Sequence, residues 1–268
     1  MKESYYHFYL NLYTFQNKLL YDVLKFMKMV YNMDMGDILS NSLLYPLQNI
    51  KALVIFIVLG VIAGISGGTT AIDFILDFLG VNNIIANEAD ILGILLFLIL
   101  SLLIVGYMID VVKWSIYRRS DSPGIDIRRQ FSNALKLVVV EIVYLFVPFV
   151  IFLILSIFLA RWISAIIGIV LFIIFALAEL MARCRLAKND SLREALAINE
   201  AMADIFKIGL IKIIFTVVLA FVMGSVLFVV SDSISDYNYI IGGFVLGVLS
   251  VYIIFFYNRA TGLLYSNV

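Results

Sequence analysis

The chain has 268 residues, of which 63% are hydrophobic and 14% are charged, and its mean hydropathy is +1.06. Water-soluble domains hold about 45–50% apolar and about 25% charged residues, so this composition excludes the soluble classes and predicts an integral membrane protein. Nineteen basic residues balance nineteen acidic ones, so the chain lacks the positive net charge that is typical of nucleic-acid binding. With one cysteine and one histidine, we predict no disulfide framework, no metal centre and no cofactor.

Residues 1–32 are rich in Tyr, Phe, Asn and Lys and precede the first long apolar run. Apolar residues recur here at helical spacing from Phe8 to Val30, which predicts an N-terminal extension that forms an interfacial helix. The alternative is a misannotated start of the chain, with the native start at Met33 or Met35. In both cases residues 33–268 are predicted to form the membrane domain.

Six apolar stretches are each long enough to cross the hydrocarbon core, which takes about 20 residues of helix. They run roughly over 50–67, 90–110, 135–160, 162–182, 208–230 and 238–258. The third span contains Pro148, which removes one backbone hydrogen bond and predicts a kink. Because only Ala160 and Arg161 separate the third and fourth spans, these two are predicted to form a tight hairpin.

Lysine and arginine fall almost entirely on one side of the six spans. They lie before the first span, in the loops after the second and fourth spans, and near the C-terminus, whereas Arg161 alone lies on the other side. Cytoplasmic loops hold an excess of these residues. We therefore predict a multi-pass protein of the cell membrane with both termini in the cytoplasm.

An amphipathic stretch precedes each pair of spans, at residues 38–47, 126–135 and 191–207. In the second stretch Asp126 can cap a helix whose apolar face holds Ile127, Phe131, Ala134 and Leu135. In the third stretch Ser191 and Glu194 form a capping box, with Ser191 as N-cap and Glu194 reaching back to it. Beyond this box the apolar face is predicted to hold Ala195, Ile198, Met202 and Ile205, and the polar face Arg193, Ala197, Glu200, Asp204 and Lys207. These stretches are predicted to be cytoplasmic interfacial helices.

An interfacial helix, an outward span and a returning span would then recur three times along the chain. Three such parallel hairpin repeats would be related by an axis along the membrane normal. The alternative is that any six-span protein with both termini on the inside contains three hairpins, so the repeat is one of two open interpretations.

Small residues in two of the spans are candidates for helix packing. The first span has the pair Gly60 and Gly64, and the sixth has the pair Gly243 and Gly247. The GxxxG spacing lets two helices approach closely. We predict packing inside the monomer, with a dimer interface as the alternative.

Glu141 and Glu179 are the acidic residues that lie well inside predicted spans. Ionisable residues there are costly and are candidates for function. Counted from the hairpin between the third and fourth spans, the two acids come to similar depths. Two carboxylates close together would share one proton, which suits proton coupling. If instead each pairs with a basic residue, as Glu179 can with Arg183 at i,i+4, their role is structural; we expect the structural outcome.

Two blocks of the sequence, residues 106–148 and 178–209, resemble the archaeal membrane-protein family catalogued as "domain of unknown function 4013". The resemblance is carried by Gly106-Tyr107, Pro123 to Asp126, Leu135-Lys136, Tyr144, Pro148, Ser191 to Ala195 and Ile208-Gly209. It covers roughly residues 33–230, and Glu141 departs from it, since the family pattern has a small or neutral residue there. The resemblance implies a polytopic archaeal membrane protein and brings no activity, substrate or catalytic residue.

The sequence thus predicts an all-α polytopic protein with six transmembrane helices and cytoplasmic interfacial helices. Its predicted function is that of a structural or accessory membrane component that contacts lipid or helices, with a membrane-protein partner or homo-oligomer left open. A transporter or channel subunit is the first alternative, although that class has broken helices and several polar groups at mid-membrane. A membrane-embedded enzyme is the second alternative, and we predict no catalytic or metal-binding residues.

Overall fold

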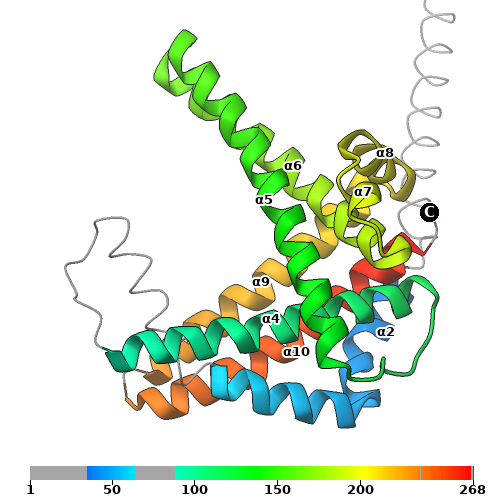
Figure 1. The fold of residues 1–268 in the computed structure, drawn as a ribbon, viewed down its shortest axis with the longest axis vertical. Helices are drawn as coiled ribbons and strands as arrows, with labels where there is room; N and C mark the ends of the chain where they lie inside the picture. Colours follow the sequence, from blue (N-terminus) through cyan, green and yellow to red (C-terminus); the bar gives the residue numbers. More distant parts are fainter. Residues whose placement is uncertain (1–34, 64–87, 236, 267) are drawn as a thin grey trace, which may run out of the picture. The chain divides into compact units, whose positions relative to one another are not determined.

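The computed structural model describes residues 35–63, 88–235, 237–266 and 268, and all regular structure in these ranges is helical (Figure 1). The predicted extension at residues 1–32 lies outside them. The chain divides into two compact units, residues 1–40 and 41–268. The helices are α2 Met35–Gln48, a helix at Ile50–Ala63, α4 Glu88–Ile116, α5 Ile127–Phe158, α6 Arg161–Asn189, α7 Leu192–Ala195, α8 Ile198–Ile208, α9 Leu210–Ser235 and α10 Tyr239–Tyr265.

Five of the described helices, α4, α5, α6, α9 and α10, are long and apolar enough to cross a membrane. The helix Ile50–Ala63 and α2 form a sixth span only if they count as one, because they are bent by 78° relative to each other. The chain is therefore a polytopic membrane protein, and its described residues are all-α with five or six candidate spans. The predicted first span, 50–67, extends beyond the described residues after Ala63.

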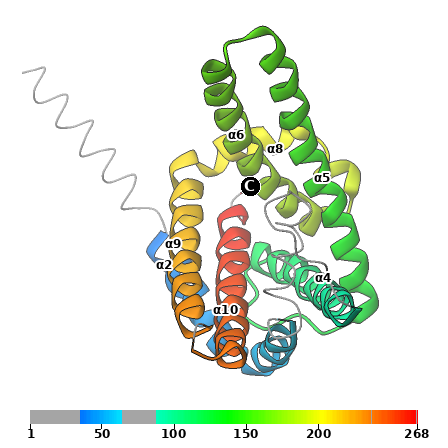
Figure 2. The ribbon, with the colours of Figure 1, turned by 90° about the vertical axis from the view of Figure 1, so that its left-hand side faces the viewer.

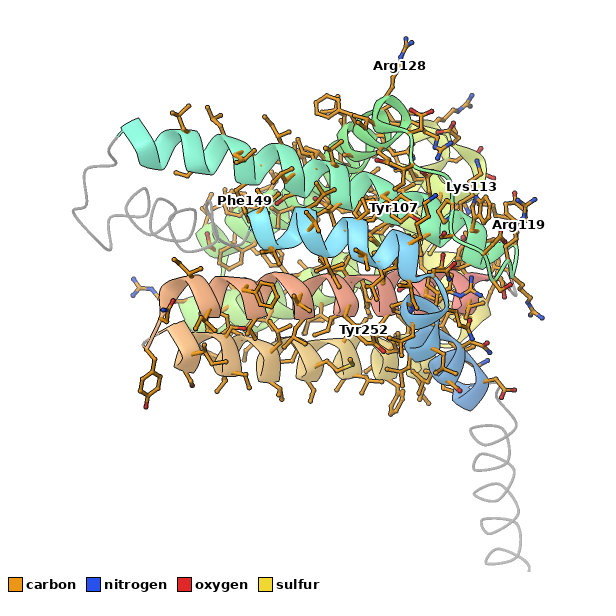
Figure 3. All side chains as sticks on the ribbon, turned by 90° about the horizontal axis from the view of Figure 1, so that it is seen from below. Tyr107, Lys113, Arg119, Arg128, Phe149 and Tyr252 are labelled. Carbon is orange, nitrogen blue, oxygen red and sulfur yellow. The ribbon has the colours of Figure 1, made fainter. Side chains whose placement is uncertain are left out.

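The helix Ile50–Ala63 packs beside α4 and α10, and α9 packs along α10 (Figure 3). Phe56 stacks on Tyr107 of α4 with 4.1 Å between ring centroids, and Phe255 of α10 packs against both rings. Such aromatic contacts add to the apolar area that they bury. This cluster is the core that joins the first described membrane helix to α4 and α10.

Gly60 and Gly247 lie where the helix Ile50–Ala63 crosses α10. A Cβ atom on Gly247 would lie 2.6 Å from the Cα atom of Val61 and 2.7 Å from the carbonyl oxygen of Gly60. Only glycine lets the two backbones approach this closely. This pair packs within the monomer, Gly243 is buried in α10, and Gly64 lies outside the described residues.

The helices α5 and α6 form a hairpin connected by Leu159 and Ala160, and its connected end extends away from α4, α9 and α10 (Figures 1 and 2). We call residues 145–174 the arm. Within the arm only Pro148, Ser164 and Gly168 are buried. Gly168 faces the ring of Phe152, where a Cβ atom would lie 2.5 Å from the ring carbon Cδ2. The arm therefore packs on itself through a narrow seam.

The start of α5 differs from the sequence prediction. Asp126 does cap the helix, and its side chain accepts a hydrogen bond of 3.1 Å from the backbone N–H of Arg129. However, α5 runs as one helix through Pro148 to Phe158, so the stretch before the third span is not a separate interfacial helix. Of the predicted apolar face, Ile127, Phe131 and Leu135 are exposed and Ala134 is buried, and the other buried residues here are Gln130, Asn133 and Leu137.

The stretch at 191–207 is two helices, α7 and α8, separated at Leu196 and Ala197, and not the single helix that the periodicity predicts. Asp204, which was assigned to the polar outer face, is completely buried. That assignment was wrong because Asp204 has buried hydrogen-bond partners on other helices. The three stretches that suggested a repeat are thus built in three ways: a bent pair of helices, the start of a long helix, and two short helices.

Candidate functional site

Glu141 of α5 and Glu179 of α6 meet at one guanidinium group. Atom Nη2 of Arg183 lies 3.3 Å from Oε1 of Glu141 and 3.1 Å from Oε1 of Glu179. The hairpin thus brings the two acids level, and both form ion pairs with the same arginine. The Arg183 and Glu179 side chains are each 19% exposed, whereas that of Glu141 is 47% exposed. The three groups together carry one formal negative charge.

A cavity of about 280 Å³ lies between α5 and α6 at the level of these acids. Its walls are formed by Glu141, Glu179, Tyr144, Leu145, Phe172, Phe175 and Ala176. The rings of Tyr144 and Phe175 pack edge to face with their centroids 6.4 Å apart. The Tyr144 hydroxyl donates a hydrogen bond of 2.9 Å to the carbonyl oxygen of Ala195. The hydroxyl is thus engaged outside the cavity, and the ring of Tyr144 forms part of the cavity wall. We call this cavity the α5–α6 crevice.

Arg185, two residues after Arg183, makes a separate cluster with α7, α8 and α10. Its atom Nη1 lies 2.9 Å from Oδ2 of Asp204, and its atom Nη2 pairs with Glu194 at 2.8 Å and with Glu200. Asp204 also accepts hydrogen bonds of 2.7 Å from Lys207 and from the hydroxyl of Tyr265. The Arg185–Asp204 junction therefore ties four helices together.

The Asp204 carboxyl group has a lowered pKa, although burial alone acts in the opposite direction. Burial raises the pKa of this group, but hydrogen bonds from Lys207, Tyr265 and Arg185 together outweigh burial and hold the pKa below its ordinary value. Asp204 is therefore ionised at neutral pH, which its pairing with Arg185 requires.

This lowered pKa predicts an acid-sensitive fold. A carboxyl group with a lower pKa in the folded state contributes stability above its unfolded pKa, about 4, and that stability is lost as pH falls through the folded pKa. We expect the melting temperature in detergent to fall as the pH drops below about 4. In Asp204→Asn this part of the pH dependence should be absent. An identical pH profile for wild type and Asp204→Asn would contradict the prediction.

Two further arginines make similar contacts at other helix crossings. Arg129 of α5 pairs with the buried Asp110 of α4 at 3.0 Å, and Asn133 donates a hydrogen bond of 3.1 Å to the same carboxylate. Arg259 of α10 donates to the hydroxyl of Ser115 at 3.2 Å and lies 4.6 Å from the centre of the Tyr45 ring.

In the sequence Arg129, Arg185 and Arg259 predict only the orientation of the chain, because their partners lie on different helices. Both Asp110 and Arg129, and Arg185 and Asp204, are separated by 19 residues along the chain. For Asp110 and Arg129, opposite charges near the facing ends of two consecutive helices were the signal that could have found them. Arg185 and Asp204 lie on α6 and α8, with α7 between them.

The predicted capping residues Ser191 and Glu194 have different roles in the structure. The Ser191 hydroxyl accepts a hydrogen bond of 3.4 Å from the backbone N–H of Glu194, which makes Ser191 the N-cap of α7. The Glu194 carboxylate accepts a hydrogen bond from Arg185 and so belongs to the Arg185–Asp204 junction. Within the described parts of the chain no three His, Cys, Asp or Glu residues are grouped as metal ligands.

A family model described as "Protein of unknown function (DUF4013)" matches residues 91–235. The match spans α4 to α9 and so includes the α5–α6 crevice and the Arg185–Asp204 pair. It starts well after residue 33, where the resemblance was expected to begin. No curated protein and no solved structure matches the chain.

Proposed function

The chain belongs to the family described as "Protein of unknown function (DUF4013)", and from that premise we propose that it is a structural or accessory membrane component. It acts through contacts of its arm with lipid or with the helices of a partner. The family description assigns no activity, so the proposal is argued from the described residues alone.

The observation that supports this function is the exposure of the arm. Ile157, Phe158 and Trp162 at its connected end are 77%, 79% and 68% exposed, and Ile169 further along α6 is 61% exposed. A transmembrane helix can direct such a surface only toward acyl chains or toward other apolar helices. Because only three residues of the arm are buried, it offers a continuous surface for either neighbour.

Photo-crosslinking tests this proposal. A benzophenone amino acid at Ile157, Trp162 or Ile169 should form adducts with phospholipid in vesicles, or with an identified polypeptide in native membranes. The matched control places the same group at the buried Ser164, where adducts should stay within the chain. If the three exposed positions also gave only adducts within the chain, the arm would pack on its own protein, and the proposal would fail.

A transporter or channel subunit is the second candidate, and one observation favours it. The α5–α6 crevice places two acids and an arginine inside spans, where ionisable groups are functional candidates. Against it, the hydroxyl groups of Thr216, Ser225 and Ser231 in α9 each donate to a carbonyl of their own helix four residues earlier. Their hydroxyl protons are therefore held within α9 itself. We rank an enzyme last, because we find no set of catalytic groups in those parts of the spans that the structure describes.

The orientation is part of the proposal. Lys113 and Arg119 lie where α4 leads into the connection to α5, and Arg128 lies at the start of α5 (Figure 3). An excess of basic residues favours the cytoplasmic side. Reporter fusions after residues 122, 190 and 268 should report a cytoplasmic location, and fusions after 85 and 235 an external one. An external signal at 122 or 190, or a cytoplasmic signal at 235, would contradict this orientation.

A further inference from the structure

We propose that the α5–α6 crevice binds the ammonium group of a cationic membrane amphiphile. The inference rests on the proposed function, since it assigns a ligand class to the base of the arm that contacts lipid. It is argued from the charge, the walls and the opening of the crevice.

The ionisable groups of the crevice have a net charge of one negative unit, which one bound cation would neutralise. Glu141 and Glu179 both contact Arg183, so one carboxylate charge is left over. The nearest basic side chains on the same two helices are already engaged: Lys136 pairs with Asp190 at 2.6 Å, and Arg185 pairs with Asp204. An excess carboxylate charge inside a span is costly, so a bound cation stabilises it.

The two acids also have atoms free to receive that cation. Both contacts with Arg183 use Oε1. Among the described residues, Oε2 of Glu141 and Oε2 of Glu179 have no hydrogen-bond partner. Two carboxylate oxygens at the edge of the cavity can thus accept hydrogen bonds from a primary ammonium group or surround a quaternary one.

The walls favour an organic ammonium over a metal ion. The rings of Tyr144, Phe172 and Phe175 line the cavity, and aromatic faces attract organic ammonium groups. A calcium or magnesium ion would need about six oxygen ligands, which this wall does not offer. A volume of about 280 Å³ holds a small headgroup and the start of a chain, and it excludes a whole phospholipid.

The opening of the crevice selects a ligand from the bilayer. Leu145, which lines it, is 63% exposed, and Phe149 one turn further along α5 is 45% exposed. Both helices are membrane spans, so this exposed side borders acyl chains. The apolar chain of an amphiphile can lie along Leu145 and Phe149 while its ammonium group reaches the acids.

Binding of dodecyltrimethylammonium to the full-length protein in a non-ionic detergent tests the proposal. We expect saturable binding, with dodecanol binding far more weakly. In Glu141→Gln, where Glu179 still pairs with Arg183, the ammonium affinity should fall about tenfold, as the loss of one charged contact implies. The matched control, Asp121→Asn, removes an exposed acid in the connection between α4 and α5, leaves Lys136 paired with Asp190, and should bind like wild type.

Three results would overturn the inference. Equal binding of dodecanol and dodecyltrimethylammonium would show that charge plays no part. Equally tight binding of tetramethylammonium would place the source of the ligand in water and not in the bilayer. Unchanged binding by Glu141→Gln, with a melting temperature like that of wild type, would show that the extra charge is held by a proton.

The outcome is separable from that of the proposed function. Loss of ammonium binding with intact crosslinks from the arm to lipid would remove only this inference. Ammonium binding with crosslinks confined to the chain would remove the proposed function and leave the crevice as a binding site.

Discussion

Replacing Gly106 with alanine is expected to destabilise the protein more than any other single methyl group added to the described helices. Gly106 of α4 lies against the backbone of Gln130 in α5. A Cβ atom there would overlap the carbonyl oxygen of Gln130 and lie 2.5 Å from its carbonyl carbon. Backbone atoms cannot rotate away, so the two helices would have to separate. We expect a loss of about 3 kcal/mol in the free energy of unfolding.

Thermal unfolding of the purified protein in detergent measures this effect. The matched control is Gly224→Ala in α9, where a Cβ atom would have no neighbour within 4 Å. That variant should be as stable as wild type or slightly more stable, because alanine favours a helix by about 0.5–1 kcal/mol over glycine. Equal melting temperatures for Gly106→Ala and wild type would show that α4 and α5 do not cross at this point.

Replacing Asp204 with alanine should have the second large effect. Asp204 is fully buried, and the change would leave the Arg185 guanidinium without its most buried partner and the Tyr265 hydroxyl without an acceptor. Removing one member of a buried pair costs about 3–5 kcal/mol, because the other charge stays buried. We expect α8 to detach from α6 and α10, and the protein to accumulate poorly in the membrane.

The comparison is with Asp190→Ala. Asp190 also pairs with a basic residue, Lys136, but its side chain is 63% exposed, and an exposed pair contributes about 1 kcal/mol or less. Protease sensitivity between α7 and α9, measured together with the melting temperature, should rise in Asp204→Ala and not in Asp190→Ala. Similar behaviour of the two variants would mean that the Arg185–Asp204 junction does not hold α8 in place.

The helices and the hairpin could be predicted because the bilayer sets the length of an apolar span. The connection was predicted at Ala160 and Arg161, from the short gap between two long apolar runs, and lies one residue earlier, at Leu159 and Ala160. The depth of Glu141 and Glu179 also followed from the sequence, since a helix rises by a fixed distance per residue. These features depend on the local sequence and on the thickness of the bilayer's hydrocarbon core.

Which face of each helix is buried could not be predicted, because burial depends on residues that are far away in the sequence. At the start of α5 the apolar residues Ile127 and Phe131 are exposed, while the polar Asn133 is buried against Asp110. The apolar periodicity locates an apolar face, but it does not show which face of the helix contacts the rest of the protein. Asp204 was misplaced for the related reason that its partners Arg185 and Tyr265 lie on other helices.

Of the residues that line the α5–α6 crevice, only the two acids, Glu141 and Glu179, were predicted as site residues. Its aromatic walls, Phe172 and Phe175, cannot be told from other apolar residues of a span until the neighbouring helix is placed. The shared contact of both acids with Arg183 likewise needs the two helices to lie side by side.

The exposure of the arm to the bilayer is the central claim, and spin-label accessibility tests it most directly. Single nitroxide labels at Ile157 and Ile169, with Cys184 replaced by alanine, would be compared in phospholipid vesicles with a label at the fully buried Ile213 of α9. We predict that oxygen, which concentrates in the bilayer, collides readily with labels on the arm, and that the label at Ile213 is protected. Labels at Ile157 and Ile169 as protected as the label at Ile213 would contradict the account.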